Sequence, residues 1–370
     1  MSEYDLKQTP LHGAHLALKA KMAAFAGYDM PIQYEGVLAE HNWCRDHAAL
    51  FDVSHMGQIT FQGEGIIEFL EKLTPSSYGS LVDGACKYSV LMNEEGGMID
   101  DLIITRVSDD HFKMVVNGAC KDKDVAWFEQ HLPEGIMMVR HEDRALLALQ
   151  GPCAETVLND VLGIDTAHLN YMNYMQAGEI DVFRLGYTGE DGFELSFPEA
   201  QATDIWNKLL AHDEVKPVGL AARDSLRLEM GYPLYGHDID ATTSPIEVGS
   251  RWIMGKLQNK TFIGSKRVLD EIENGAKRQR IGFELIDRGV AREGAEIFDA
   301  SGETQVGVIT SGTFSPTLQK AIGMAYIDSQ YASDLGTEVI VRVRGRDLKA
   351  KITGLPFMEA QTKKNFKKAA

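Results

Sequence analysis

The sequence predicts an α+β protein in two parts, a larger mixed region followed by a small domain built from strands. In the first two-thirds of the chain, helix-like and strand-like segments are interspersed without a regular strand–helix–strand rhythm, which favours α+β over a doubly wound parallel sheet. From residue 281 to residue 355 the pattern changes to short apolar runs broken by Gly, Asp and Ser. Closely spaced short strands of this kind are typical of a small antiparallel sheet or barrel.

The boundary between the two parts is expected near a charge-rich, helix-like stretch at residues 260–280. A chain of 370 residues with 44% hydrophobic content exceeds the size at which one core usually stops growing, so more than one domain is expected. We predict a first domain at residues 1–262, a linker at 263–279 and a C-terminal domain at 280–370.

Within the first domain, the spacing of apolar residues separates helices from strands. Apolar residues recur at helical spacing in segments 65–74 and 202–212, which predicts two amphipathic helices. Segments 87–92, 98–107 and 112–118 are short and rich in apolar and β-branched residues, so we expect them to be strands.

Composition narrows the class of protein. The formal net charge of −17 opposes binding to phosphate backbones, so nucleic acid is not expected as a partner. No run of about 18 apolar residues predicts a transmembrane helix, and the first residues lack a signal or transit pattern, so we expect a cytoplasmic protein. The four cysteines form no C-x-x-C pair, so neither a zinc site nor a redox motif is predicted, and we expect reduced thiols, mostly in the core.

The most informative local feature is a predicted hairpin with two acids in its second strand. Residues 93–97, Asn-Glu-Glu-Gly-Gly, are turn formers between two strand-like runs. Asp100 and Asp101 follow inside the second run, although Asp is depleted from strand interiors. Successive side chains point to opposite faces, and both faces are otherwise apolar, so at least one carboxylate is expected in a half-buried place. The pattern leaves open which Asp has a function, or whether this is only an edge strand with one acid in water.

A glycine-rich segment at residues 185–195, LGYTGEDGFEL, is a second candidate site. Its glycines allow tight turns and close approach of a ligand. Tyr187 could stack on a flat heterocycle, and Glu194 could accept paired hydrogen bonds from an amino-pyrimidine edge. The alternative is a glycine-rich hairpin with solvated acids. The segment lacks the signature of a phosphate-binding loop.

Residues 219–231 predict a helix closed by a glycine. Arg223 and Arg227 stand four residues apart and share a face of this helix, so one of them could clamp a ligand carboxylate. The alternative is an arginine paired with Asp224 or Glu229.

Other features carry weaker signals. His55 is a lone histidine, which is more often structural than catalytic. Glu247 and Trp252 fall near the predicted domain edge, and residues 310–318 read as a polar loop of the C-terminal domain. The basic segment 363–368 is either solvated or able to touch an acidic partner.

Several collinear blocks together resemble the glycine cleavage T-protein family, from about Thr9 to Phe357. They read FAGYDMPIQY, LFDVSHMGQ, YSVLMNEEGGMIDDL, MVVNGA, ALQGP, GYTGEDGFEL, GLAARDSLRLE, LYGHDID, SPIEVG and TSGTFSPTLQKAIGMA. The resemblance implies a folate-binding part of two intertwined subdomains and a C-terminal β-barrel, arranged as a cloverleaf around a central channel.

The resemblance also implies an activity. A T-protein takes an aminomethyl group from the dihydrolipoyl arm of the H-protein and transfers its carbon to tetrahydrofolate, which is a co-substrate. The products are 5,10-methylenetetrahydrofolate, ammonia and the reduced arm, and no metal is expected to take part.

By the same resemblance, Asp101 matches the catalytic aspartate of the family, the second acid of the GG-x-x-DD pattern. Family members commonly carry a tyrosine near the folate soon after Pro-Phe, whereas this chain reads PFMEAQTKKNFKK, which leaves the C-terminal contribution to the pocket open. The positions at which the family lines its folate pocket are Tyr88, Asn117, Tyr171, Tyr187, Glu194 and Arg223.

Three other functions are alternatives for a chain with this pattern. A folate-dependent demethylase of a small methylated sulfur or amine compound would share the fold, although the complete GG-x-x-DD and GYTGEDGFEL blocks favour the T-protein. A non-catalytic folate-binding maintenance protein typically carries a K-G-C-Y block, which is absent here. A fused folate domain of a flavin-dependent amine oxidase would need a dinucleotide fingerprint and a longer chain.

Overall fold

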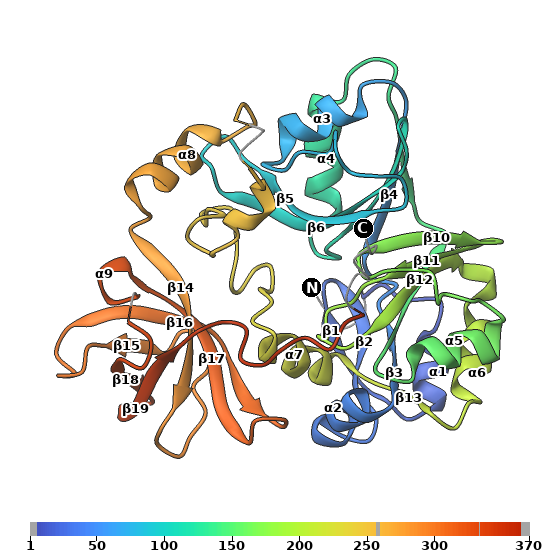
Figure 1. The fold of residues 1–370 in the computed structure, drawn as a ribbon. Helices are drawn as coiled ribbons and strands as arrows, with labels where there is room; N and C mark the ends of the chain where they lie inside the picture. Colours follow the sequence, from blue (N-terminus) through green and yellow to red (C-terminus); the bar gives the residue numbers. More distant parts are fainter. Residues whose placement is uncertain (1–5, 257–259, 333, 364–370) are drawn as a thin grey trace, which may run out of the picture.

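The chain folds into three lobes, each with its own sheet (Figure 1). The computed structural model describes residues 6–256, 260–332 and 334–363. Two of the lobes are mixed helix-and-sheet units and the third is a closed barrel, as expected for an α+β chain with a C-terminal barrel. None of the described helices is both long and apolar enough to cross a membrane.

The first lobe contains the predicted hairpin in a five-stranded antiparallel sheet of order β5-β6-β7-β4-β8. Helices α3 (Ile66–Leu73) and α4 (Lys121–His131) pack on one face of this sheet through apolar side chains such as Phe69 and Phe128. The predicted helix and strands of this region are confirmed. The strands are β4 (Gly57–Gln62), β5 (Cys86–Met92), β6 (Met98–Ser108), β7 (His111–Val116) and β8 (Met137–His141).

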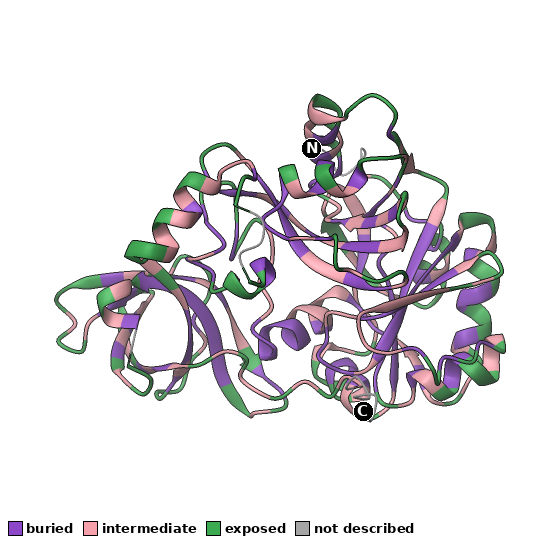
Figure 2. Ribbon diagram, turned by 45° about the horizontal axis from the view of Figure 1, so that its top comes forward, coloured by how far each residue is buried: buried purple, intermediate pink, exposed green. Residues whose placement is uncertain are grey.

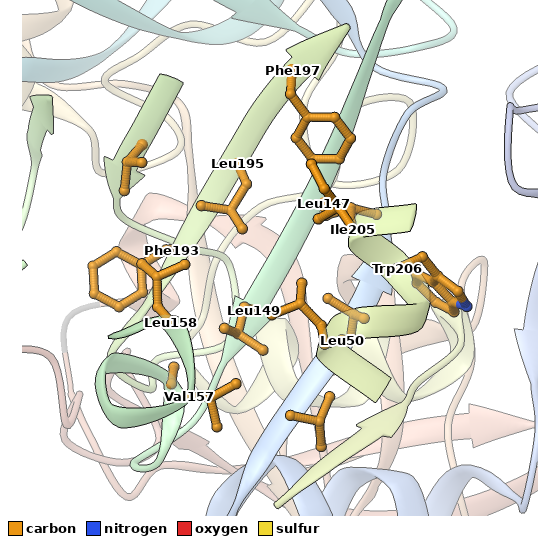
Figure 3. Packing of buried hydrophobic residues seen from close by; sticks show 14 of the residues in the cluster. Leu50, Leu147, Leu149, Val157, Leu158, Phe193, Leu195, Phe197, Ile205 and Trp206 are labelled. Atoms are coloured by element: carbon orange, nitrogen blue, oxygen red, sulfur yellow. The ribbon is translucent and has the colours of Figure 1, made fainter. Parts of the chain in front are cut away.

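The second lobe is a six-stranded sheet of order β10-β11-β12-β9-β3-β13, antiparallel except for the parallel pair of β3 and β13. Figure 3 shows its core, in which Trp206 and Ile205 of α6 face Leu50, Leu147 and Leu149 of the sheet. The elements are α1 (His12–Ala17), β3 (Ala48–Asp52), β9 (Arg144–Gln150), α5 (Ala154–Leu162), β10 (Asn173–Ala177), β11 (Ile180–Arg184), β12 (Gly192–Pro198), η2 (Glu199–Gln201), α6 (Ala202–Leu210) and β13 (Val215–Pro217).

The third lobe is a closed barrel of order β14-β17-β16-β15-β18-β19. The prediction of a polar loop at residues 310–318 is wrong for residues 310–315, which belong to β16, whereas residues 316–318 form a turn. The polar side chains of β16 are used inside the protein: Ser311 and Ser315 are buried and hydrogen-bonded to charged residues of the first domain. The strands are β14 (Arg278–Leu285), β15 (Glu296–Phe298), β16 (Gln305–Ser315), β17 (Lys320–Asp328), β18 (Glu338–Val343) and β19 (Arg346–Thr353), with α9 (Ser329–Ala332).

The remaining elements connect the lobes. The predicted helix-like stretch before the barrel contains α8 (Ser265–Asn274). Figure 2 shows that the long strands are buried along most of their length, whereas peripheral helices carry exposed residues on their outer faces. The other connecting elements are β1 (Lys21–Phe25), β2 (Tyr28–Gln33), α2 (Val37–Asp46), α7 (Leu220–Glu229) and η3 (Arg251–Met254).

Helix α7 ties the barrel to the rest of the molecule through two buried charges. Arg227 donates to Asp238 at 2.7 Å and to Ser311 of the barrel at 2.8 Å. Glu229 accepts from Arg45 of α2 at 2.6 Å and from Ser315 of the barrel at 2.5 Å. Both charges are paired and hydrogen-bonded, which is the condition for burying them without a large loss of stability.

Replacing Glu229 with glutamine should therefore destabilise the fold. The variant removes one of the two carboxylates that pair with Arg45, so that only Glu190 remains, and breaking a buried pair costs about 3–5 kcal/mol. Denaturant unfolding at neutral pH measures this, with Glu303→Gln, at an exposed barrel position, as the control.

The loss should also depend on pH. Burial acts to raise the pKa of Glu229, but the contacts with His41, Ser315 and Arg45 outweigh it and lower that pKa to about 2. The contribution of Glu229 is thus complete above its ordinary pKa of about 4.3 and is lost as pH falls toward the folded value. The stability gap between wild type and variant should narrow over that window, and a constant gap would contradict the assignment.

Candidate active site

A cavity of about 1360 Å³ lies where the three lobes meet. This volume exceeds the roughly 300–1,000 Å³ typical of a small-molecule pocket, so it has room for more than one substrate. The catalytic and folate-pocket residues that the resemblance implied are all part of its wall, although they come from strands β5, β6 and β12, from loops and from α7. They are Tyr88, Asp101, Asn117, Tyr171, Tyr187, Glu194 and Arg223.

The hairpin of β5 and β6 brings Asp101 to the cavity. Its turn closes through a hydrogen bond from Asn93 N to Gly97 O at 3.0 Å. A Cβ atom on Gly97 would lie 1.8 Å from the carbonyl oxygen of Ala241, so only glycine fits there. Beyond the turn the strand alternates as predicted: Asp100 is fully buried in the protein, and Asp101 keeps part of its surface accessible in the cavity wall.

Two neutral donors hold the Asp101 carboxyl group. Tyr88 Oη donates to its Oδ2 at 3.0 Å, and Asn117 Nδ2 donates to its Oδ1 at 2.7 Å. Burial and the nearby charge of Asp100 nevertheless raise the pKa of Asp101 to about 7. A carboxyl group with a pKa near neutrality can both accept and return a proton at the pH of a cell.

Asn117 also holds the neighbouring acid. Its backbone N–H and its Nδ2 each donate to Asp100 at 2.9 Å. One asparagine therefore fixes both carboxyl groups, and the structure separates their roles, which the strand pattern left open: Asp101 faces the cavity, whereas Asp100 supports it from behind.

Glu194 of β12 and Arg223 of α7 form a second, charged part of the wall. Glu194 is 8% exposed, and burial raises its pKa while the charge of Arg223 acts in the opposite direction. The Arg223 guanidinium lies 4.9 Å from the centre of the Tyr187 ring. Its Nη1 is buried and has no hydrogen-bond partner within the described part of the chain. The wall thus offers both a carboxylate and an unsatisfied cationic donor to a ligand.

In the glycine-rich segment and in α7, some charged side chains pair with other residues of the protein, and one in each segment is free to meet a ligand. Of the acids in the glycine-rich segment, Glu190 pairs with Arg45 at 2.9 Å and Asp191 pairs with Arg184, whereas Glu194 faces the cavity. On α7, Arg227 is committed to Asp224, Asp238 and Ser311. Arg223 is therefore the arginine of the pair that is free to meet a ligand.

Sequence reasoning missed part of the aromatic lining of the cavity, including Tyr232. Tyr232 stacks on Tyr187 with ring centres 5.7 Å apart, and Trp252 stacks on Tyr88, also at 5.7 Å. Trp252 is 65% exposed at the edge of the cavity. A tryptophan near a domain boundary was the only available signal, since stacking partners far apart in sequence leave no spacing pattern.

His55 also belongs to the cavity wall, although a lone histidine is more often structural. It is 4% exposed and its Nδ1 has no partner among the described residues. Burial lowers the pKa of His55 to about 4, so the ring is neutral at neutral pH. Glu247, by contrast, is structural, because it pairs with Arg267 and Arg278, each at 3.0 Å.

The C-terminal segment returns to the cavity. Leu355 and Pro356 contribute to its wall, and Gln361 N donates to Gly189 O at 2.8 Å beside the glycine-rich segment. Residues 364–368 of the basic segment lie outside the described residues, and Lys363 pairs with Glu155 at 3.3 Å.

Comparisons with known proteins cover almost the whole chain. The family model described as GCVT N-terminal domain matches residues 11–258, and the one described as glycine cleavage T-protein C-terminal barrel domain matches residues 278–359. Curated aminomethyltransferases from Flavobacterium psychrophilum and Bacteroides thetaiotaomicron are each 42% identical, over 95% of this chain and 99% of theirs. A probable mitochondrial aminomethyltransferase of Schizosaccharomyces pombe is 41% identical, over 96% of this chain and 94% of its own.

A solved structure has the same fold. The glycine cleavage system aminomethyltransferase T from Bartonella henselae superposes with a TM-score of 0.93 and is 39% identical, with 97% of this chain and 100% of that chain covered.

The hydrogen bond from Tyr88 predicts a measurable shift at Asp101. Because Tyr88 Oη stabilises the ionised carboxylate, Tyr88→Phe should raise the pKa of Asp101 further, by roughly one pH unit. Carbon NMR titration of labelled aspartate carboxyls measures this, with the Asp101 signal assigned from Asp101→Asn. Tyr174→Phe is the matched control, since Tyr174 donates to Asp181 instead. An unchanged or lower pKa in Tyr88→Phe would refute the interaction.

Proposed function

The chain belongs to the glycine cleavage T-protein family and is an aminomethyltransferase, and we propose that its central cavity brings tetrahydrofolate and the lipoyl arm of an H-protein together at Asp101. The family uses tetrahydrofolate as a substrate and works with the H-protein. The observation that carries the proposal is one carboxyl group with a pKa of about 7 in a cavity large enough for both substrates.

The charged part of the cavity wall suits the two ends of a folate. The pterin presents an amino group and a ring N–H side by side, and a carboxylate such as Glu194 can accept both hydrogen bonds. Tyr187 and Tyr171 offer aromatic faces for a flat ring. The unsatisfied Nη1 of Arg223 suits a carboxylate or carbonyl oxygen of the substrate.

The reaction breaks two bonds at the transferring carbon and makes two. The carbon leaves the sulfur and the nitrogen of the aminomethyl group and bonds to N5 and N10 of tetrahydrofolate. The two N–H protons of the folate end on the departing thiol and on ammonia, so atoms and charges balance. We assign to Asp101 the acceptance of a folate proton and the stabilisation of positive charge on the transferring carbon.

Positioning should contribute more than proton transfer. General acid–base help is worth about 10²–10⁴ in rate, whereas holding two reactants in line can be worth roughly 7–11 kcal/mol. The donors from Tyr88 and Asn117 fix the Asp101 carboxyl group before substrate arrives, and the cavity wall supplies the rest of the alignment. The net charge of −17 argues against nucleic acid as a partner.

The direct test of this function is ammonia release from aminomethyl-lipoyl H-protein, with and without tetrahydrofolate. We expect release to depend on tetrahydrofolate. Conversion of small methylated thioethers or amines with no response to the H-protein would instead favour the demethylase alternative.

Asp101→Asn should nearly abolish this turnover. The amide cannot accept the proton, so the rate should fall by at least about 10²–10⁴, while the dissociation constant of tetrahydrofolate stays within a few-fold. Asp109→Asn, an exposed acid beyond the end of the same strand, is the control. A rate close to that of the wild type in Asp101→Asn would remove Asp101 from the mechanism.

Glu194→Gln should instead weaken substrate binding. Replacing one carboxylate oxygen by an amide leaves a donor facing a donor, and hydrogen bonds to charged groups are worth about 1.5–3 kcal/mol. Tetrahydrofolate affinity should fall by about ten- to a hundredfold, as measured by calorimetry. Glu199→Gln, exposed just after the same strand, should bind as the wild type does. Unchanged affinity in Glu194→Gln would place the pterin elsewhere.

A further inference from the structure

A third acid is buried behind the active-site pair. Asp124 lies in the first turn of α4, and its side chain is 0% exposed. Neither of its oxygens meets an N–H or hydroxyl donor within hydrogen-bonding distance in the described part of the chain. Lys123 Nζ lies 3.6 Å from Asp124 Oδ1 and donates its hydrogen bond to the carbonyl oxygen of Ile99. A fully buried carboxylate in such surroundings would be very costly.

The partner of Asp124 is the other buried acid. Asp100 and Asp124 come together at the start of α4. Asp100 accepts two hydrogen bonds from Asn117. Cys120 N donates to Asn117 O at 2.9 Å, and Asp124 N donates to Cys120 O at 2.9 Å. Asn117 then donates to Asp101. A continuous series of contacts therefore runs from α4 to the carboxyl group that faces the cavity.

Two acids in contact inside a protein must share a proton. Like charges at this distance cannot both persist, and burying each ion costs several kcal/mol. The N-terminal end of a helix favours a negative charge, but only by about 0.3–2 kcal/mol, so burial outweighs it. Asp100 already accepts two hydrogen bonds from Asn117, whereas Asp124 accepts none from the described residues, so the proton belongs on Asp124. Burial and the charge of Asp100 raise the pKa of Asp124 to about 9.

We propose that Asp124 is a positioning residue that works as a neutral acid: its carboxyl O–H donates to Asp100, which holds Asn117 and, through Asn117, sets the orientation of Asp101. The kinetic part of this proposal rests on the proposed function, whereas the protonation of Asp124 does not. The neutral form also leaves only one negative charge, that of Asp100, behind Asp101. The titratable groups that face these acids from the surrounding elements are Cys120, Lys123 and Tyr235 around Asp100 and Asp124, and Tyr88 and Tyr187 around Asp101.

Infrared spectroscopy tests the protonation state without any substrate. The difference spectrum between the wild type and Asp124→Asn at neutral pH should contain the carbonyl band of a protonated carboxylic acid, present in the wild type and lost in the variant. Asp122→Asn, an exposed acid on the same helix, should lose no such band. If Asp124→Asn removes a carboxylate band instead, Asp124 is ionised and the proposal is overturned.

Kinetics test the positioning role. Asp124→Asn keeps a neutral donor in the same place, so kcat should stay within a few-fold of the wild type and the acid limb of its pH profile should not move. Asp124→Val keeps the volume but has no donor, so kcat should fall by about ten- to a hundredfold while KM for tetrahydrofolate is unchanged. Asp100→Asn removes a charge from behind Asp101 and should move the acid limb to lower pH.

Each outcome decides between the alternatives. A shift of the acid limb in Asp124→Asn as large as that in Asp100→Asn, or wild-type kcat in Asp124→Val, would overturn the proposal. Should thermal unfolding show that Asp124→Val does not fold, the infrared band and the pH profile of Asp124→Asn still decide. Failure of the proposed function would appear separately, as a wild-type protein that releases no ammonia in response to tetrahydrofolate.

Discussion

The lobes that enclose the cavity are joined by buried polar contacts on α7, together with small apolar clusters shared between lobes, such as that of Leu228 with Ile322 and Met324. Each lobe packs its own hydrophobic cluster around its own sheet. At their junction, Arg227 and Glu229 of α7 reach in turn to Asp238, to α2 and to the barrel. Charged groups that must be paired and hydrogen-bonded tolerate little displacement, so this junction fixes the lobes at defined positions and leaves the space between them open.

The same requirement, that buried polar groups be satisfied, organises the chemistry. Adjacent acids on one strand point to opposite faces, and Asn117 supplies hydrogen bonds to both. Each acid accepts two hydrogen bonds, but only the outer acid, Asp101, has accessible surface. The pKa of Asp101 rises to about 7 because burial and the charge of Asp100 outweigh the donors from Tyr88 and Asn117, which favour ionisation.

The variety of residues in the cavity wall matches the chemistry of the two proposed substrates. A flat heterocycle, a carboxylate-bearing tail and a long lipoyl arm present aromatic, polar and apolar surface in turn. The aromatic rings of Tyr187 and Tyr232, the Glu194 carboxylate and the Arg223 guanidinium come from different elements, and they converge only because the sheets and α7 meet there. Aligning two substrates should lower the activation free energy more than any single proton transfer does.

The sequence alone determined the features that are local. The hairpin, the alternation of Asp100 and Asp101, helices α3, α6 and α7 and the strand-rich C-terminal region all follow from the spacing of residues, and the family resemblance pointed to the residues around the cavity; the domain limits drawn at 262 and 280 stay a prediction. Tertiary structure decided the rest. It determined which Asp faces the cavity and that Arg223, and not Arg227, is free to meet a ligand. It also turned the polar residues of 310–315 into a strand and brought His55, Trp252 and Asp124 near the site. The physical reason is that periodicity records which face of an element is buried, whereas the state of a charged or polar group depends on partners that the fold brings from distant parts of the chain.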